Sequence, residues 1–206
     1  MKILFWAGWA LSRVLFTVGG GLRIEGQEHI PRDGGFLLAT NHISYYDPPL
    51  VGSCVPREVY FFAKQELFRN PLVKRLLLRV NALPVNRGAV DRQSLKASID
   101  VIKAGYGLTF FPEGTRSRTG DLLSPKPGLG LIATRAQCPI VPTAIIGSDD
   151  FRSCLTRKRR IVVRFGEPFS SEWVASFGRG KGAYLEIAQA VMGRIGKLRD
   201  ASSDQI

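Results

Sequence analysis

Short apolar runs alternate with segments of mixed polarity along most of this 206-residue chain. Apolar runs bounded by glycine, proline or polar residues are typical of buried strands. They predict strands over residues 22–24, 35–40, 58–63, 81–85, 107–111, 139–146 and 161–165. Cap signals and helical spacing predict helices that begin at Asp47 and Asn70, and helices over 91–104, 128–135 and 184–198. This alternation indicates an α/β fold, layered, with a largely parallel sheet flanked by helices.

The first apolar stretch, residues 3–18, has the period of an amphipathic helix. One stripe holds the cations and tryptophans, and the opposite face is aliphatic. The stripe contains Lys2, Trp6, Trp9, Arg13 and Thr17, and the aliphatic face contains Leu4, Ala7, Leu11, Val14, Leu15 and Val18. Such a helix is typical of the lipid interface. We predict a membrane-interface helix over residues 1–20, ended by three glycines, and one domain over residues 21–206.

Other interpretations of this helix stay open. A transmembrane or re-entrant helix is one, although the run is shorter than about 20 apolar residues and contains Arg13. Ordinary packing against a core is another. A secretory signal peptide is disfavoured, because no convincing small-residue cleavage site follows the apolar stretch.

A second segment, residues 70–80, combines apolar and basic positions. Its apolar residues are Leu72, Val73, Leu76, Leu77 and Val80, interspersed with Lys74, Arg75 and Arg79. A helix of this composition lines an acyl-chain groove or touches lipid. Alternatively, it packs in the core while its cationic side chains extend to water.

The formal net charge of +12 and the pI near 10.1 favour acidic partners: nucleic acid, anionic lipid or phosphorylated small molecules. A basic run at residues 157–160 suits either a solvated loop or an anionic membrane surface. The aromatic residues are not interleaved with the cations as in a stacking platform, so nucleic acid is the weaker alternative. Three dispersed cysteines and two histidines show no disulfide framework or zinc spacing. We expect no metal and a reducing compartment.

Histidine is the side chain whose ordinary pKa suits a general base near neutral pH, and the chain has only His29 and His42. Asp47 follows His42 by five residues, so a turn can bring its carboxylate back to one imidazole nitrogen. No carboxylate follows His29 before Asp33, so His42 is the better candidate. No Gly-x-Ser-x-Gly elbow is present, so the target of such a base is a substrate hydroxyl. Asp47 also has the simpler interpretation of a helix N-cap.

Candidate anion-binding residues follow two other predicted strands. Glu113 and Gly114 form a tight turn after the run 107–111, and Arg116 and Arg118 come next. Arg87 follows the run 81–85. Arginine side chains match phosphate oxygens in pairs, and the carboxyl ends of parallel strands gather chemistry at one edge of a sheet. Each of these residues also has a simpler interpretation as an exposed surface charge.

Taken together, these strings resemble a known family, the 1-acyl-sn-glycerol-3-phosphate (lysophosphatidate) acyltransferases of the glycerolipid acyltransferase superfamily. Four blocks, within about residues 20–165, match in order. They are Asn41-His42-x-Ser44-x-x-Asp47, Leu83-Pro84-Val85-Asn86-Arg87-Gly88, Phe111-Pro112-Glu113-Gly114-Thr115-Arg116-Ser117 and Val141-Pro142-Thr143-Ala144-Ile145, with Lys126-Pro127-Gly128 between the last two. Asn81, where glycine is usual, and Thr143, where valine is common, are small departures.

The resemblance implies transfer of an acyl group from acyl-CoA or acyl-carrier protein to the sn-2 hydroxyl of lysophosphatidate, giving phosphatidate. It implies that His42 is the base and Asp47 its orienting carboxylate. It implies substrate binding by Arg87, Glu113, Gly114, Thr115 and Arg116.

We also expect no cofactor beyond the acyl donor, an anionic membrane surface as partner, which the net charge favours, and a membrane-associated location on the cytoplasmic face. Glycerol-3-phosphate or another lyso-lipid is the alternative acceptor. A basic binding protein for membranes or nucleic acid, without turnover, is the remote alternative.

Overall fold

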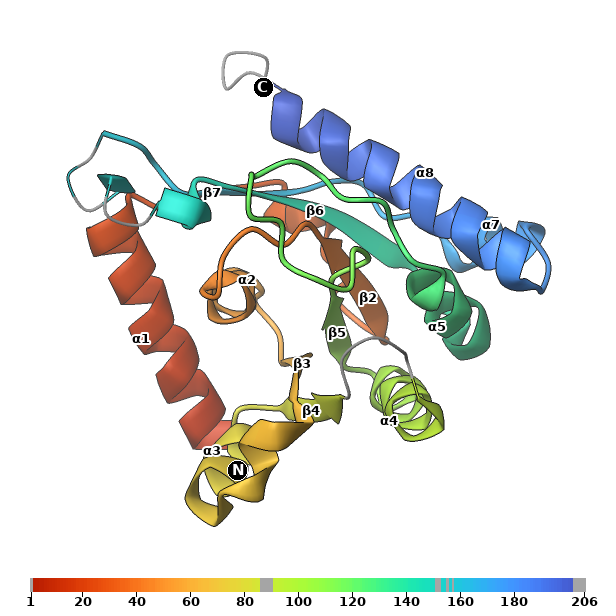
Figure 1. Cartoon of the computed structure of the whole chain (residues 1–206), viewed down its shortest axis with the longest axis horizontal. Coiled ribbons are helices and arrows are strands. Elements are labelled where there is room, and N and C mark those ends of the chain that lie inside the picture. Colours follow the sequence, from red (N-terminus) through yellow and green to blue (C-terminus); the bar gives the residue numbers. More distant parts are fainter. Residues whose placement is uncertain (1, 86–90, 151–152, 155, 157, 202–206) are drawn as a thin grey trace.

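A seven-stranded sheet forms the centre of the protein in a computed structural model, which describes residues 2–85, 91–150, 153–154, 156 and 158–201 (Figure 1). The strand order is β1-β7-β6-β2-β5-β3-β4. The strands are β1 (Arg23–Glu25), β2 (Phe36–Thr40), β3 (Val59–Lys64), β4 (Ala82–Val85), β5 (Gly107–Phe110), β6 (Ile140–Ile146) and β7 (Val162–Phe165). All neighbours are parallel except β6 and β7, which are antiparallel. The predicted α/β fold with a largely parallel sheet is confirmed.

Helices cover both faces of the sheet (Figure 1). The helices are α1 (Lys2–Gly20), α2 (Asp47–Cys54), α3 (Pro71–Arg79), α4 (Arg92–Lys103), α5 (Gly128–Ala136), α7 (Ser171–Ser176) and α8 (Lys181–Asp200). The sequence pattern missed α7, and it did not predict that β7 runs antiparallel. Asn70 caps α3, as expected, because its side-chain oxygen accepts from the N–H groups of Leu72 and Val73 at 2.9 and 3.3 Å.

Strand β2 shows why the sheet needs helices on both sides. Its five residues are all buried, and successive side chains point to opposite faces. Phe36 and Leu38 pack with α1 and α2, whereas Leu37 and Ala39 pack with α4, α5 and α8. A strand that is apolar on both faces is typical of a parallel sheet buried between two helical layers.

Helix α1 packs on the protein through part of its predicted stripe, and its aliphatic face is largely exposed. Phe5 and Phe16 are buried, and Trp9 and Arg13 face α2, whereas much of the aliphatic face is exposed. Residues Ile3–Gly20 form a stretch that is long and apolar enough to cross a membrane, with a mean hydropathy of 1.4 and 17% of it buried. Trp9 and Arg13 of the predicted stripe attach the helix to the protein through their hydrogen bonds to the Val55 and Ser53 carbonyls. The division into residues 1–20 and 21–206 stays a prediction.

Helix α3 lies on the outside of the molecule, close to α1 (Figure 1). None of its residues is buried, and Leu72 is 80% exposed. The interpretation of this segment as a core helix is therefore wrong. Asn81, just after α3, has a φ of 64°, in the left-handed region that glycine adopts most easily and asparagine tolerates. This geometry explains why asparagine can replace the expected glycine.

Candidate active site

The candidate residues meet at the carboxyl ends of three adjacent strands, β6, β2 and β5. Asn41 and His42 follow β2, and Pro112 and Glu113 follow β5. Ser148 lies just beyond the end of β6, after the turn at Gly147. Because parallel neighbours end at one edge of a sheet, residues 41, 113 and 148 come together although they are far apart in sequence.

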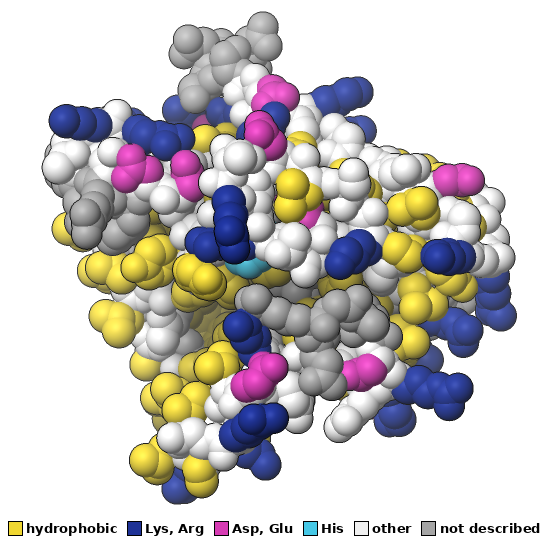
Figure 2. Space-filling view, in the orientation of Figure 1, with side chains coloured by type: hydrophobic (Ala, Val, Ile, Leu, Met, Phe, Trp, Pro, Cys, Tyr) yellow, Lys and Arg dark blue, Asp and Glu magenta, His cyan; other side chains and the backbone are white. Residues whose placement is uncertain are grey.

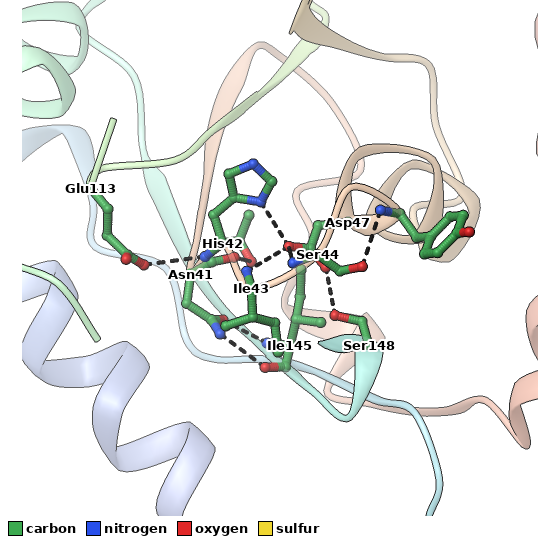
Figure 3. Close-up of polar contacts among 10 residues, drawn as sticks. Asn41, His42, Ile43, Ser44, Asp47, Glu113, Ile145 and Ser148 are labelled. Carbon is green, nitrogen blue, oxygen red and sulfur yellow. Dashed lines mark hydrogen bonds and ion pairs between the residues drawn. The ribbon is translucent and has the colours of Figure 1, made fainter. Parts of the chain in front are cut away.

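The predicted contact between His42 and Asp47 is present (Figure 3). The ring atom Nδ1 of His42 lies 2.7 Å from Oδ2 of Asp47. A carboxylate only accepts hydrogen bonds, so this contact favours the tautomer with its proton on Nδ1. The other ring nitrogen, Nε2, is then free to accept a proton.

Asp47 is completely buried, and three other donors reach its carboxylate. Oδ2 also accepts from the backbone N–H groups of Ile43 and Ser44 at 2.8 and 2.7 Å, and Oδ1 accepts from the hydroxyl of Ser148 at 2.6 Å. Asp47 is the first residue of α2, and it does not cap this helix as the simpler interpretation expected. Its side chain turns back to the loop that carries His42, and these hydrogen bonds offset the cost of burying the charge.

Ser148 is the functional candidate that sequence reasoning missed. It is buried and lies 101 positions from Asp47 in sequence, beyond any local motif. Gly147, just before it, has a φ of 82°, and a Cβ there would lie 2.4 Å from the carbonyl oxygen of Arg160. The glycine lets the chain turn sharply after β6. A Gly-Ser pair directly after a buried strand was the available signal.

Asn41 fixes the loop to β6 (Figure 3). Its amide nitrogen donates to the Ile145 carbonyl at 2.9 Å, and its amide oxygen accepts from the Ile145 N–H at 2.7 Å. The buried side chain thus continues the pairing of β2 with β6 beyond the end of the strand. This pairing holds His42 and Ser148 on adjacent strand ends.

Glu113 is buried and lies beside the backbone of His42 (Figure 3), where its side chain accepts hydrogen bonds from the main chain. Its two carboxylate oxygens accept from the N–H groups of His42 and Leu123, both at 3.2 Å. Burial raises the pKa of Glu113, and these two N–H groups oppose the rise. This geometry gives Glu113 a supporting contact with the loop that carries His42, and its assignment as a substrate-binding residue stays a prediction.

A cavity of about 590 Å³ opens beside His42. Apolar side chains including Phe62, Phe110 and Leu131 form part of its wall, and the His42 ring stacks on Phe111 with centroids 4.1 Å apart. Gly114, Thr115 and Arg116, predicted to bind substrate, also line this cavity. A space that is partly apolar and partly polar suits an amphipathic small molecule.

Among the residues that the structure describes, four cationic side chains line the same cavity: Lys64, Arg116, Lys126 and Lys181. The Arg116 guanidinium lies over the Tyr45 ring, 3.9 Å from its centroid, which restrains it beside the cavity. The chain at Gly114 has a φ of 68°, and a Cβ there would come within 3.1 Å of the Lys126 side chain. Lys64 and Lys181 were not singled out from sequence. Arg87 lies outside the described residues, and Arg118 is exposed.

His29 lies apart from the His42–Asp47 pair and contacts the carbonyl oxygen of Phe165 through Nδ1 at 2.9 Å. Within the described ranges, no group of three or more His, Cys, Asp or Glu residues is placed to hold a metal ion. The contact between His42 and Asp47 lies next to a cavity that is cationic and partly apolar.

Comparison with known proteins identifies the class. A family model described as Acyltransferase matches residues 21–146, which include the β2, β5 and β6 strand ends. The chain belongs to this acyltransferase family, and it is an O-acyltransferase.

Named relatives narrow the resemblance to the 1-acyl-sn-glycerol-3-phosphate acyltransferases. A protein of that name from Bacillus subtilis is 31% identical over 157 residues, which cover 76% of this chain and 77% of the relative. One from Streptococcus pneumoniae is 28% identical over 158 residues, covering 75% of this chain and 58% of the relative. The crystal structure of the 1-acyl-sn-glycerophosphate acyltransferase PlsC from Thermotoga maritima superposes with a TM-score of 0.77 at 26% identity, covering 98% of this chain and 83% of that one.

Proposed function

We propose that this protein transfers an acyl group from a thioester donor to the sn-2 hydroxyl of lysophosphatidate, giving phosphatidate. The main support is the contact between His42 and the buried Asp47 beside a cationic cavity. The names of the relatives support the acceptor. Phosphatidate formation is also consistent with the partly apolar wall, because the acceptor carries both a phosphate and an acyl chain.

In this mechanism Nε2 of His42 takes the proton of the acceptor hydroxyl as its oxygen attacks the thioester carbonyl carbon. The new C–O ester bond forms, the C–S bond breaks, and the proton passes from the imidazolium to the leaving thiolate. Asp47 fixes the tautomer of His42 and stabilises the imidazolium. The hydrogen bonds from residues 43, 44 and 148 keep that carboxylate in place.

Cations at the cavity hold the acceptor phosphate in this proposal. Arg116 supplies a planar pair of donors, and Lys126 lies next to the Gly114 turn. Arg87, implied by the resemblance, is a further candidate. Phe62, Phe110 and Leu131 offer apolar surface for the chain of the acceptor or donor.

The first experiment incubates the purified protein with lysophosphatidate and a labelled long-chain acyl-CoA, and in parallel with acyl-carrier protein as donor. We expect labelled phosphatidate with the wild type and a rate lower by about 10²–10⁴-fold with His42→Ala, the range typical of a lost general base. His29→Ala is the matched control and keeps its activity. Substantial turnover by His42→Ala would remove this residue from the base role.

The choice of acceptor is tested in the same assay with glycerol-3-phosphate and with a lyso-lipid of different headgroup. We expect lysophosphatidate to give the highest kcat/KM. A higher value for another acceptor would keep the reaction class and change the substrate.

We also propose that the enzyme sits on the cytoplasmic face of an anionic membrane, through the outer side formed by α1 and α3. Hydrophobic side chains gather over these two helices, with lysine and arginine next to α3 (Figure 2). Ile3 of α1 is 86% exposed, and Lys74 and Arg75 of α3 are exposed beside its leucines. Exposed aliphatic surface rimmed by cations suits the boundary between acyl chains and anionic headgroups.

Vesicle flotation tests this location. We expect Leu72→Ser with Leu76→Ser to weaken binding to neutral and anionic vesicles, and Arg75→Glu to weaken binding to anionic vesicles. Lys103→Glu on α4 makes the same charge change at another exposed site and serves as the control. Unchanged flotation of both α3 variants would exclude this helix from the membrane contact.

A further inference from the structure

The C-terminal end of α2 is held by three side chains from the N-terminal part of the chain. Arg13 of α1 donates to the Ser53 carbonyl at 3.3 Å, and Trp9 Nε1 donates to the Val55 carbonyl at 2.9 Å. Gln27, in a short 3-10 helix (Gln27–His29), donates to the Cys54 carbonyl at 2.7 Å. Three consecutive carbonyls, which a helix end leaves without intrahelical partners, are thus each bound from outside.

The opposite end of the same helix carries the candidate catalytic carboxylate. Helix α2 has eight residues and is about 12 Å long, and Asp47 is its first residue. Asp47 accepts four hydrogen bonds of 2.6–2.8 Å, including the one from His42. A short helix moves largely as one body, so a tilt or shift at residues 53–55 displaces the carboxylate as well.

We infer that Trp9, Arg13 and Gln27 are positioning residues for the reaction, which hold α2 from its C-terminal end and thereby keep Asp47 in register with His42. The positive charge of Arg13 also suits the negative end of the α2 dipole. The guanidinium lies 5.9 Å from the Trp9 ring centroid, so the two side chains restrain each other. The inference rests on the proposed role of Asp47 and gives α1 a part in catalysis besides membrane attachment.

The test uses the full chain in detergent micelles, where attachment to a bilayer does not limit the rate. Trp9→Phe keeps an aromatic ring, although a smaller one, and removes the N–H donor. Arg13→Met keeps much of the stem and removes the charge. A misplacement of about 1 Å at a catalytic group can cost about 100-fold in rate. We expect the double variant to lose about ten- to hundred-fold in kcat with little change in KM, and to shift the pH profile of kcat. Replacing Arg13 by Lys instead of Met keeps the positive charge, and we expect this variant to retain part of the rate that Arg13→Met loses.

Ala10→Ser is the matched control, because Ala10 lies on the same helix next to Trp9 and is exposed. It keeps the wild-type kcat in micelles, and circular dichroism checks that all variants are folded. An unchanged kcat in the double variant, or a loss with an unshifted pH profile, would overturn the inference.

Proton NMR separates this inference from the proposed reaction. The Nδ1–H resonance of His42, assigned with His29→Ala, reports its hydrogen bond to Asp47 without any turnover. We expect this signal to shift or broaden in the Trp9→Phe, Arg13→Met variant and to stay in place in Ala10→Ser. A signal that stays in place in the double variant as well as in the control contradicts the inference. This outcome does not depend on which acceptor the enzyme uses.

Discussion

The sheet edge around Asp47 differs in polarity from the outer side formed by α1 and α3. The edge buries a charged group, whereas the outer side exposes apolar groups to the surroundings. At the edge a buried carboxylate receives donors from His42, Ile43, Ser44 and Ser148. On the outer side, large aliphatic side chains lie exposed. A buried charge depends on each of its partners, whereas an apolar surface acts through its total area. We therefore expect a change of one atom to have a large effect at the sheet edge, whereas on the outer side an effect requires the replacement of several residues.

The largest effect is expected for Asp47→Asn. The amide matches the carboxylate in size but removes its charge and one acceptor, so the His42 tautomer and the imidazolium lose their support. We expect kcat to fall by about 10⁴-fold, as for a comparable change in a catalytic triad. Steady-state kinetics measure the fall. Asp121→Asn, at an exposed position, is the control and changes kcat little.

The same leucine substitution in the two regions sharpens the comparison through stability. Leu38→Ala removes a completely buried side chain and is expected to lower the free energy of unfolding by about 2–5 kcal/mol. Leu76 of α3 is 53% exposed, and Leu76→Ala is expected to change that free energy by about 0.5 kcal/mol or less. Denaturant unfolding in detergent measures both. A similar loss in the two variants would show that α3 is packed more firmly than its exposure indicates.

Ser148→Ala tests one hydrogen bond at the edge. Loss of a donor to a buried carboxylate leaves Oδ1 of Asp47 short of one partner, and hydrogen bonds to charged groups contribute about 1.5–3 kcal/mol. We expect kcat to fall by about tenfold, since part of this loss appears in the transition state. Ser148→Thr keeps the hydroxyl and restores part of the rate. Equal rates for the alanine variant and the wild type would mean that the contact is dispensable.

The smallest effect is a pH dependence at Glu113. Burial raises its pKa above the ordinary value of 4.5, so the folded protein holds this proton to higher pH than the unfolded chain does. Its contribution to stability is present below the unfolded pKa and is lost as the pH rises through the folded pKa. We expect the wild type to lose stability relative to Glu113→Gln over that rise. A difference in unfolding free energy that stays constant with pH would contradict the buried-charge argument.

The sequence predicted most of the strands and helices because nearly every element has a clear period or cap signal, as β2 and α3 do. It also placed His42 and Asp47 together, since they are close in sequence. It could not predict the partners that come from distant segments, such as Ser148 on Asp47 or Trp9 on Val55, because no local pattern records them. The sequence could not predict the exposure of α3 either. Apolar residues interspersed with lysine and arginine occur both in core helices and in surface helices.

The pairing of β1 with β7 has a consequence for the order of events during synthesis. Arg23 pairs with Val162, 139 positions later in the chain, so the edge of the sheet next to α1 closes only after all the intervening residues have been made. Contacts of such wide sequence separation form late in folding. Helix α1, by contrast, is synthesised before any strand of the sheet. During the interval before β1 can pair with β7, the apolar helix α1 can bind a lipid surface while the catalytic domain is still folding.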